Sequence, residues 1–197
     1  MASSATNTNE SEHWSKRRMT LDEFQYANPL PDARTELVEG RMIVRDPPKE
    51  LHGLVSARIL RALFRYLDRR YESEAESGVV LCNDVGILLQ RDPPTVRAAD
   101  VCYYLASRVP RDRTQYSEEV PDMVLEVRSP TDRAGYLREK IGDWQRGGCR
   151  HIWVADPRKR TFTEISADLV TTLHEGELFG GGALFPGLDL EIRALFQ

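Results

Sequence analysis

The sequence predicts an α/β fold with a central mixed β-sheet flanked by helices. The first observation is the segment 50–70, whose apolar residues recur every three or four positions, as in an amphipathic helix. The second is an apolar run that breaks at Ser129-Pro130 and is followed by a helical pattern up to Gly147-Gly148. Short β-branched and aromatic runs bounded by glycine and proline make up much of the rest, as strands do. Strands interspersed with helices in this way predict a layered domain.

The composition is typical of a globular protein of one domain. The chain has 197 residues, of which 41% are hydrophobic and 29% charged, enough to bury one core. Its net charge of −4 means that any surface for nucleic acid must be local. No apolar run approaches the ~18 residues of a membrane span, and the polar N-terminus lacks the apolar segment of a secretory signal. We therefore expect a disordered tail over residues 1–18, a single domain over residues 19–197, and a cytoplasmic location.

The three cysteines, Cys82, Cys102 and Cys149, have no CxxC spacing and lie in apolar runs. An odd number without metal-ligand spacing is typical of buried free thiols in a reducing compartment.

The N-terminal third predicts a short helix, a hairpin and a long helix. Thr20-Leu-Asp-Glu23 has the spacing of a capping box, so a helix should start there and end near Asn28-Pro29. Two β-rich runs within residues 35–45, joined through Glu39-Gly40, predict a hairpin. Four arginines follow one face of the helix 50–70, and they are either a solvated face or a row of phosphate contacts. These arginines are Arg58, Arg61, Arg65 and Arg69.

The remaining elements are predicted in order. Strands are expected at 79–82, 85–89 and 100–105, with a break at 92–94 and a surface loop over 106–120. A central strand at 122–128 leads into a helix that begins near Thr131 or Asp132. The core face of that helix is expected to contain Ala134, Leu137, Ile141 and Trp144. Strands at 150–155 and 161–165 form a further hairpin, and 169–173 and 188–192 are peripheral strands.

The central strand carries the main candidate for chemistry, Glu126. Alternation places Glu126 on the opposite face from Met123 and Val127, where an α/β fold should be covered, so a carboxylate there calls for a function. Asp122 is on the same face, but four residues along a strand separate the two acids by ~13 Å, too far to share one ion. Asp100 is the better partner if the strands 100–105 and 122–128 are neighbours. Two carboxylates suit Mg²⁺ or Mn²⁺, which could activate water for phosphodiester hydrolysis.

Such chemistry also needs a cation beside the carboxylates, and two residues are candidates. Arg128 stands two positions after Glu126 and therefore on the same strand face. Lys140 lies on the next helix at the edge of its apolar stripe and could lean over the end of the sheet. We favour Lys140, because arginine is permanently protonated whereas lysine can lose its proton with a modest pKa shift.

Together these segments resemble the Uma-type family of putative restriction endonucleases, a branch of the PD-(D/E)xK nuclease superfamily. The resemblance covers residues 20–195 and rests on an ordered set of short motifs. They are Glu36-Leu-Val-Glu-Gly-Arg-Met-Ile43, His52, Asp100-Val-Cys-Tyr-Tyr104, Asp122-Met-Val-Leu-Glu-Val-Arg-Ser-Pro130, Lys140 and Gly147-Gly-Cys-Arg-His-Ile-Trp-Val-Ala-Asp-Pro157. Two positions depart from the pattern: Ala99 replaces a proline, and Arg128 stands where the superfamily has lysine.

The resemblance implies a restriction-endonuclease-like core and divalent-metal hydrolysis of a phosphodiester. Asp100 and Glu126 match the metal-binding acids, and Lys140 matches a lysine moved onto the following helix. Glu36 and His52 match an acidic and a histidine position near the site, although Glu36 could be an exposed hairpin residue and His52 a helix-start residue.

Three functions stay open from the sequence. The first is a Mg²⁺-dependent endonuclease acting on DNA, for which a homodimer would place two sites on the two strands. The second is a nuclease-fold protein that binds nucleic acid or a partner without cutting. The third is a nuclease acting on RNA or on branched nucleic acid.

Overall fold

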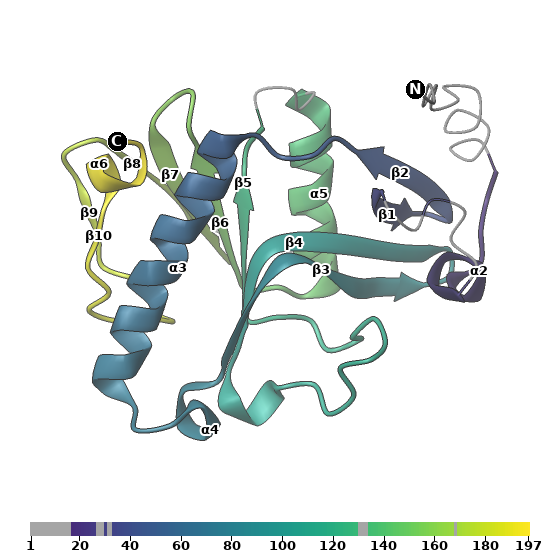
Figure 1. Ribbon diagram of the computed structural model, residues 1–197, viewed down its shortest axis with the longest axis horizontal. Helices are drawn as coiled ribbons and strands as arrows, with labels where there is room; N and C mark the ends of the chain where they lie inside the picture. Colours follow the sequence, from purple (N-terminus) through teal and green to yellow (C-terminus); the bar gives the residue numbers. More distant parts are fainter. Residues whose placement is uncertain (1–16, 27–29, 31–32, 130–133, 168) are drawn as a thin grey trace, which may run out of the picture.

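The computed structural model describes residues 17–26, 30, 33–129, 134–167 and 169–197, and the features below concern these residues (Figure 1). The first half of the chain contains α2 (Leu21–Tyr26), β1 (Arg34–Val38), β2 (Arg41–Arg45), α3 (Glu50–Arg70), α4 (Glu74–Ser77), β3 (Val79–Arg91), β4 (Pro94–Tyr104) and the 3₁₀ turn η1 (Ala106–Arg108). The second half contains β5 (Met123–Val127), α5 (Ala134–Gly147), β6 (His151–Asp156), β7 (Thr161–Ser166), β8 (Leu169–His174), β9 (Leu178–Phe179), β10 (Leu190–Glu191) and α6 (Ile192–Leu195). The predicted α/β class is confirmed.

One eight-stranded sheet organises the molecule. Its order is β2-β1-β4-β5-β6-β7-β8, and β3 pairs with β4 off this path. In the described sheet, β5 and β6 run parallel and are connected through α5, whereas the other neighbours are antiparallel. The connection is long because parallel strands cannot be joined by a tight turn. The sheet is therefore mixed, as expected, and mostly antiparallel.

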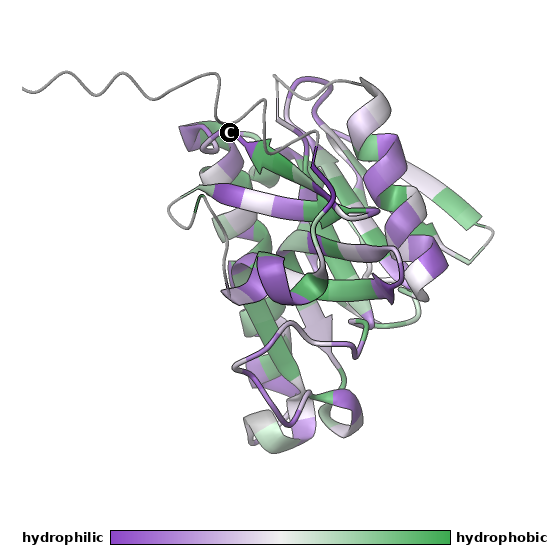
Figure 2. Ribbon diagram, turned by 90° about the vertical axis from the view of Figure 1, so that its right-hand side faces the viewer, coloured by the Kyte–Doolittle hydropathy of each residue, from purple (hydrophilic) through white to green (hydrophobic). Residues whose placement is uncertain are grey.

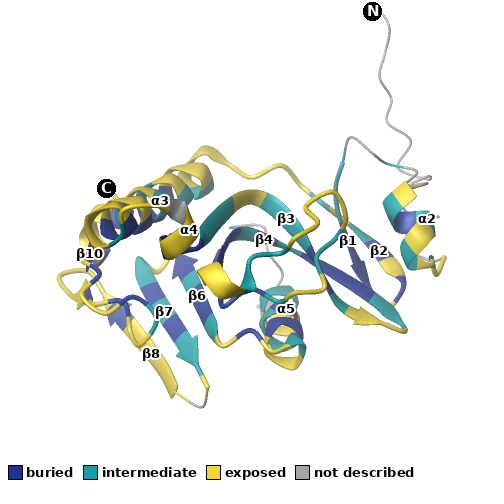
Figure 3. Ribbon diagram, turned by 90° about the horizontal axis from the view of Figure 1, so that it is seen from below, coloured by how far each residue is buried: buried dark blue, intermediate teal, exposed yellow. Residues whose placement is uncertain are grey.

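Helices cover the two faces of this sheet (Figure 3). On one face α3 packs through Val55, Ile59 and Leu63 in a core that includes Met123 and Leu125 of β5. On the other face Trp144 of α5 packs in a second core that includes Val124. The predicted alternation of β5 is thus confirmed, and hydrophobic residues concentrate along the strands between these layers (Figure 2). Because both faces are covered, the side chain of Glu126 is buried.

Local signals placed the N-terminal elements correctly. Thr20 and Glu23 form the reciprocal hydrogen bonds of a capping box at the start of α2. Glu39 and Gly40 join β1 to β2 with φ of 49° and 75°, as a two-residue hairpin turn with positive φ requires. Two predicted helix boundaries lie outside the described residues: the end of the first helix near Asn28-Pro29 and the start of another at Thr131 or Asp132. Residues 1–16 of the expected tail lie outside them too. Arg18, at the end of that tail, forms an isolated bridge with Arg41.

The predicted start of a strand at Asp100, after a break at 92–94, is wrong. β4 begins at Pro94 and pairs with β3 from Arg91 onward, so Asp100 lies inside a long strand and does not open one. The two consecutive prolines suggested a break. The chain makes only a tight turn there, between the end of β3 at Arg91 and the start of β4 at Pro94. The two predicted strands 79–82 and 85–89 are one strand, β3, with a bulge at Asn83 and Asp84.

Other corrections concern exposure. Cys82 is exposed, whereas Cys102 and Cys149 are buried, and all three are free. Leu51, Leu54 and Phe64 of the predicted apolar stripe are exposed, so the buried stripe of α3 is narrower than its pattern indicated. The peripheral strand expected over 188–192 is the two-residue β10 followed by the short helix α6. In the described chain, no helix is long and apolar enough to cross a membrane.

Candidate active site

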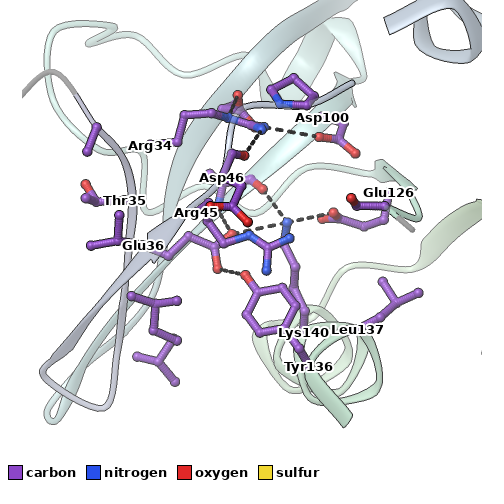
Figure 4. Close-up of a pocket in the computed structure, with 18 of the residues that line it drawn as sticks. Arg34, Thr35, Glu36, Arg45, Asp46, Asp100, Glu126, Tyr136, Leu137 and Lys140 are labelled. Carbon is purple, nitrogen blue, oxygen red and sulfur yellow. Dashed lines mark hydrogen bonds and ion pairs between the residues drawn. The ribbon is translucent and has the colours of Figure 1, made fainter. Parts of the chain in front are cut away.

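A pocket of about 1240 Å³ opens where the β1–β2 hairpin faces the middle of β4, the end of β5 and the first half of α5 (Figure 4). Its lining includes five of the six candidate residues from the sequence, namely Glu36, His52, Asp100, Glu126 and Lys140. These residues come from five different elements, β1, α3, β4, β5 and α5. The tertiary structure therefore gathers into one pocket side chains up to 104 positions apart in the sequence.

Asp100 and Glu126 lie on neighbouring strands, as expected. β4 and β5 are antiparallel with Val101 opposite Leu125, and this register continued by one residue puts Asp100 opposite Glu126. Asp100 Oδ2 accepts a hydrogen bond from the backbone N–H of Val127 at 2.7 Å and lies 3.1 Å from His52 Nε2. His52 therefore orients a carboxylate in the pocket, and it does not act as a helix cap.

Lys140 is buried at the bottom of the pocket. Its ammonium nitrogen Nζ donates to Glu126 Oε2 at 2.6 Å and to the backbone carbonyl of Ala98 at 2.6 Å, and it lies 3.1 Å from Glu36 Oε1. The other oxygen of Glu126, Oε1, accepts a hydrogen bond from the Trp144 indole N–H at 2.8 Å. Both oxygens of Glu126 thus face donors from α5, which hold this carboxylate in one orientation.

Glu36 is buried between β1, β4 and α5, and is not an exposed hairpin residue. It accepts hydrogen bonds from Arg97 NH1 at 2.9 Å, from the backbone N–H of Ala98 at 3.1 Å and from the Tyr136 hydroxyl. Arg97 is fully buried and also pairs with Asp143, at 2.7 Å from Nε to Oδ2. This ionic network links the hairpin to α5 and places Glu36 against Lys140.

Burial and charge push the pKa values of the carboxyl groups apart. Burial raises the pKa of Glu126 to about 8, against the opposing effect of Lys140. For Glu36 burial is outweighed by the charges of Lys140 and Arg97, which lower its pKa to about 2. Burial is likewise outweighed at Asp100, where the hydrogen bond from His52 and the charge of Lys140 lower the pKa. A site with both kinds of carboxyl group is typical of acid–base or metal chemistry.

Lys140 keeps its proton, which corrects our reason for preferring it. Burial alone would lower the pKa of this lysine, but Glu126 and Glu36 overcome that effect and raise the pKa above its usual value. A lysine that forms ion pairs with two carboxylates is stabilised in its charged form. Its role in the pocket is that of a fixed cation, not of a base.

Arg128 does not line the pocket. β5 ends at Val127, and the Arg128 side chain turns to Asp156 at the end of β6, with 2.8 Å between NH1 and Oδ2. Asp122, at the other end of β5, accepts from the backbone N–H of Leu105 and pairs with Arg108. This acid connects a turn to the sheet, consistent with the expectation that it is a strand-entry residue.

The arginines on α3 also lie outside the pocket lining. Arg61, Arg65 and Arg69 are exposed, and Arg58 donates to the backbone carbonyl of Leu195. Their arrangement agrees with a solvated helix face.

Several residues of the site were missed from the sequence. Tyr136 and Asp143 were not singled out, although with the predicted Lys140 they follow one another at helical spacing and, beside Trp144, form a partly polar stripe on α5 that faces the site. The missed signal was this polar stripe beside the apolar one. Arg97 was overlooked because it lies between the predicted break and the predicted strand, where no element was expected.

The buried charges at the bottom of the pocket do not balance. Four carboxylates with side chains at most 9% exposed, Glu36, Asp100, Glu126 and Asp143, face two equally buried cations, Arg97 and Lys140. The buried acids therefore exceed the buried cations by two. Glu126 pairs with Lys140, while Asp100, which faces Glu126 across the strand pair, has His52 and the partly exposed Arg34, 3.8 Å away, beside it. Buried charge of this kind favours either a bound proton or a bound cation. In the described residues no group of three or more His, Cys, Asp or Glu could hold a metal, but Mg²⁺ is commonly held by one or two carboxylates with waters and substrate phosphate.

Comparison with known proteins identifies the family. The sequence model of the Uma2 family, described as "Putative restriction endonuclease", matches residues 21–193. The chain belongs to the Uma2 family. No curated protein sequence matches the chain.

A solved structure agrees in fold with this Uma2 chain. It is described as a crystal structure of "a putative nuclease belonging to DUF820" from Anabaena variabilis. The two share 18% sequence identity with a TM-score of 0.73, over 90% of this chain and 97% of the other. At this identity the likeness establishes the fold alone. The restriction-endonuclease-like fold expected from the motifs is thus confirmed.

Proposed function

We propose that this Uma2 protein is a divalent-metal-dependent endonuclease that hydrolyses phosphodiester bonds in DNA. It would act on duplex DNA as a homodimer. The observation that carries the proposal is the pair of buried carboxylates, Asp100 and Glu126, on facing residues of β4 and β5, in a pocket whose buried acids outnumber its buried cations. The hard carboxylate oxygens of this pair fit Mg²⁺ or Mn²⁺. When bound there, such an ion polarises a phosphoryl oxygen and lowers the pKa of a coordinated water.

The residues of the chain have distinct tasks in this reaction. Asp100 and Glu126 would hold the ion, and His52 orients Asp100 through the contact of 3.1 Å to Oδ2. Trp144 and Lys140 fix the two oxygens of Glu126. Glu36 and Arg97 keep Lys140 in place from the opposite side. This preorganisation holds the ligands before substrate arrives, which lowers the reorganisation needed during reaction.

A cleavage assay with matched variants tests the proposal. Purified protein is incubated with plasmid, with single-stranded DNA and with RNA, in Mg²⁺, Mn²⁺ or EDTA. We expect metal-dependent cleavage that Asp100→Asn and Glu126→Gln abolish. Asp122→Asn is the control, because Asp122 is a buried acid next to the same strand but outside the pocket lining. Equal melting temperatures with and without substitution would show that any loss is chemical.

Two outcomes would overturn the proposal. One is the absence of cleavage of every nucleic acid in every metal, which would favour a nuclease-fold protein that binds without cutting. The other is cleavage that survives in Asp100→Asn or Glu126→Gln at the rate of Asp122→Asn.

A further inference from the structure

Lys140, the cation at the bottom of the pocket, is already surrounded by acceptors of the chain. A lysine ammonium carries three N–H donors, and those of Lys140 face Glu126, Ala98 O and Glu36 at 2.6, 2.6 and 3.1 Å. A phosphate could contact this ammonium only by displacing one of its acceptors. Substrate charge must therefore be met by other cations on the pocket wall.

The other cationic side chains in the described lining are three arginines of the β1–β2 hairpin, Arg34, Arg41 and Arg45. Arg41 is exposed beside the hairpin turn, where it pairs with Val38. Arg34 and Arg45 form the cross-strand pair at the opposite end of the hairpin. Residues directly opposite in an antiparallel pair project from the same face. Two positive charges are thus placed side by side on the pocket wall.

This placement is costly unless anions lie nearby, since like charges opposite each other destabilise a strand pair. Arg34 is held by Asp84 through two nitrogens, Nε at 2.6 Å from Oδ2 and NH2 to Oδ1, and its NH1 donates to the backbone carbonyl of Asp46 at 3.2 Å. Within the described residues, one N–H on each of NH1 and NH2 is left for a further acceptor. Arg45 lies over the ring of Tyr136, with its guanidinium carbon 4.0 Å from the ring centroid. Each arginine is therefore oriented by a separate contact, and the pair is kept at the pocket (Figure 4).

The support for Arg34 is built into the backbone. Asp84 and its neighbour Asn83 occupy the bulge of β3 with φ of 57° and 77°, a region that non-glycine residues seldom adopt. Bulges beside functional sites commonly redirect a side chain. Here the bulge presents Asp84 to Arg34, whose NH2 then lies 3.8 Å from Asp100 Oδ1. An anion bound beside Asp100 would be within reach of the same guanidinium.

We infer that Arg34 and Arg45 form a phosphate-binding pair that holds the sugar-phosphate backbone of a nucleic acid over Asp100 and Glu126. This inference rests on the proposed nuclease function and names the residues by which the pocket would bind its substrate. Guanidinium groups bind phosphate oxygens through paired hydrogen bonds, which lysine cannot reproduce. The arginines lie at the wall and the acids at the bottom, so the phosphate is held between cations of the chain and the carboxylate end of the pocket.

Binding without cleavage tests the inference. The anisotropy of fluorescein-labelled duplex DNA, single-stranded DNA and RNA of one sequence is measured in Ca²⁺ and in EDTA at several salt concentrations. We expect Arg34→Ala and Arg45→Ala each to weaken binding about tenfold and to reduce the salt slope by about 0.9 on duplex DNA, or about 0.7 on single strands. Arg34→Lys and Arg45→Lys should keep the slope while losing part of the affinity.

Arg91→Ala is the matched control, because Arg91 also pairs with a carboxylate, Glu118, through two nitrogens but lies outside the pocket lining. Affinities and slopes of the pocket variants equal to those of this control would overturn the inference, as would absence of binding by the unsubstituted protein to all three probes. The inference stands if Arg34→Ala and Arg45→Ala weaken binding more than the control does, whichever nucleic acid binds best.

The two proposals fail separately. Unchanged binding with normal metal-dependent cleavage in Arg34→Ala/Arg45→Ala would remove the phosphate-binding pair and leave the nuclease proposal intact. If the protein cleaves no nucleic acid but its binding depends on Arg34 and Arg45, the nuclease proposal fails and the phosphate-binding pair stands. Should an alanine variant unfold, the corresponding lysine variant decides, since it keeps the charge beside Asp84 or Tyr136.

Discussion

Replacing Lys140 by methionine removes the buried cation while keeping an unbranched side chain of similar length. The ammonium is 7% exposed and contacts Glu126, Ala98 O and Glu36. Without it, Glu126 loses its nearest counter-charge and Glu36 keeps only one of its two described ion-pair partners, Arg97. Removing one partner of a buried ion pair costs about 3–5 kcal/mol of stability. We expect Lys140→Met to lower the free energy of unfolding in EDTA by this amount.

The loss should depend on pH and on metal in a defined way. A proton can replace the missing cation on a carboxylate, so the loss should be smaller at pH 6 than at pH 8. A divalent ion can do the same, and at about 100 times its Kd a ligand adds about 2.7 kcal/mol of stability. Mg²⁺ should therefore stabilise Lys140→Met more than the unsubstituted protein, while cleavage is lost.

Urea unfolding followed by tryptophan fluorescence, at both pH values and with EDTA or Mg²⁺, provides the measurement. The double variant Lys140→Met/Glu126→Gln is the control, because it removes both charges of one pair and should recover part of the stability. A decrease of less than about 1 kcal/mol in the free energy of unfolding in EDTA would refute the reasoning, because removal of a buried lysine that balances buried carboxylates should cost more. Equal stabilisation of both proteins by Mg²⁺ would refute the metal part.

Three further predictions concern neighbouring residues. Lys140 and Arg97 lower the pKa of Glu36 to about 2 in the folded protein, from an ordinary value of 4.5. Its ionisation therefore stabilises the fold above pH 4.5, and this contribution is lost as the pH falls. Glu36→Gln should therefore lack about 2 kcal/mol of the stability change between pH 5 and pH 3, measured by urea unfolding; identical pH profiles would contradict this. Trp144→Phe keeps an aromatic ring but loses the bond to Glu126, so calorimetric titration should show Mn²⁺ affinity about tenfold weaker, and an unchanged Kd would exclude that role. Arg128→Ala loses a partly exposed pair with Asp156; it should cost about 1 kcal/mol at most in thermal unfolding and leave cleavage near its original rate, whereas a loss of activity would place Arg128 at the site.

Much of the fold could be predicted because its signals are local. The period of α3, the capping box at Thr20 and Glu23, and the positive-φ turn at Glu39-Gly40 each depend on a few neighbouring residues. The alternation of β5 also placed Glu126 on the correct face. Errors arose where distant pairing decided the outcome. The segment before Asp100 is a strand because β3 pairs with it along its whole length, and no pattern within 94–99 indicated this.

The sequence predicted some of the residues that line the pocket but not their relations. The resemblance to the family and the exclusion of Asp122 led to Asp100, Glu126 and Lys140, and the structure places the three in one pocket. Arg128 could not be separated from Lys140 by spacing, because β5 ends one residue before Arg128 and the ion pair with Asp156 turns it away. The contribution of Arg97 and Tyr136 depends on burial, which a sequence pattern does not report.

The sequence by itself determined the class of fold, the order of its main elements, and a carboxylate, Glu126, on a strand face that must be covered. These properties follow from periodicity and turn chemistry, which act over a few residues. Only the tertiary structure decided which acid faces Glu126, that Lys140 remains charged between two carboxylates, and that Arg34 and Arg45 stand together at the pocket wall. Strand register and burial set these relations, because they fix which charges meet and how poorly water screens them.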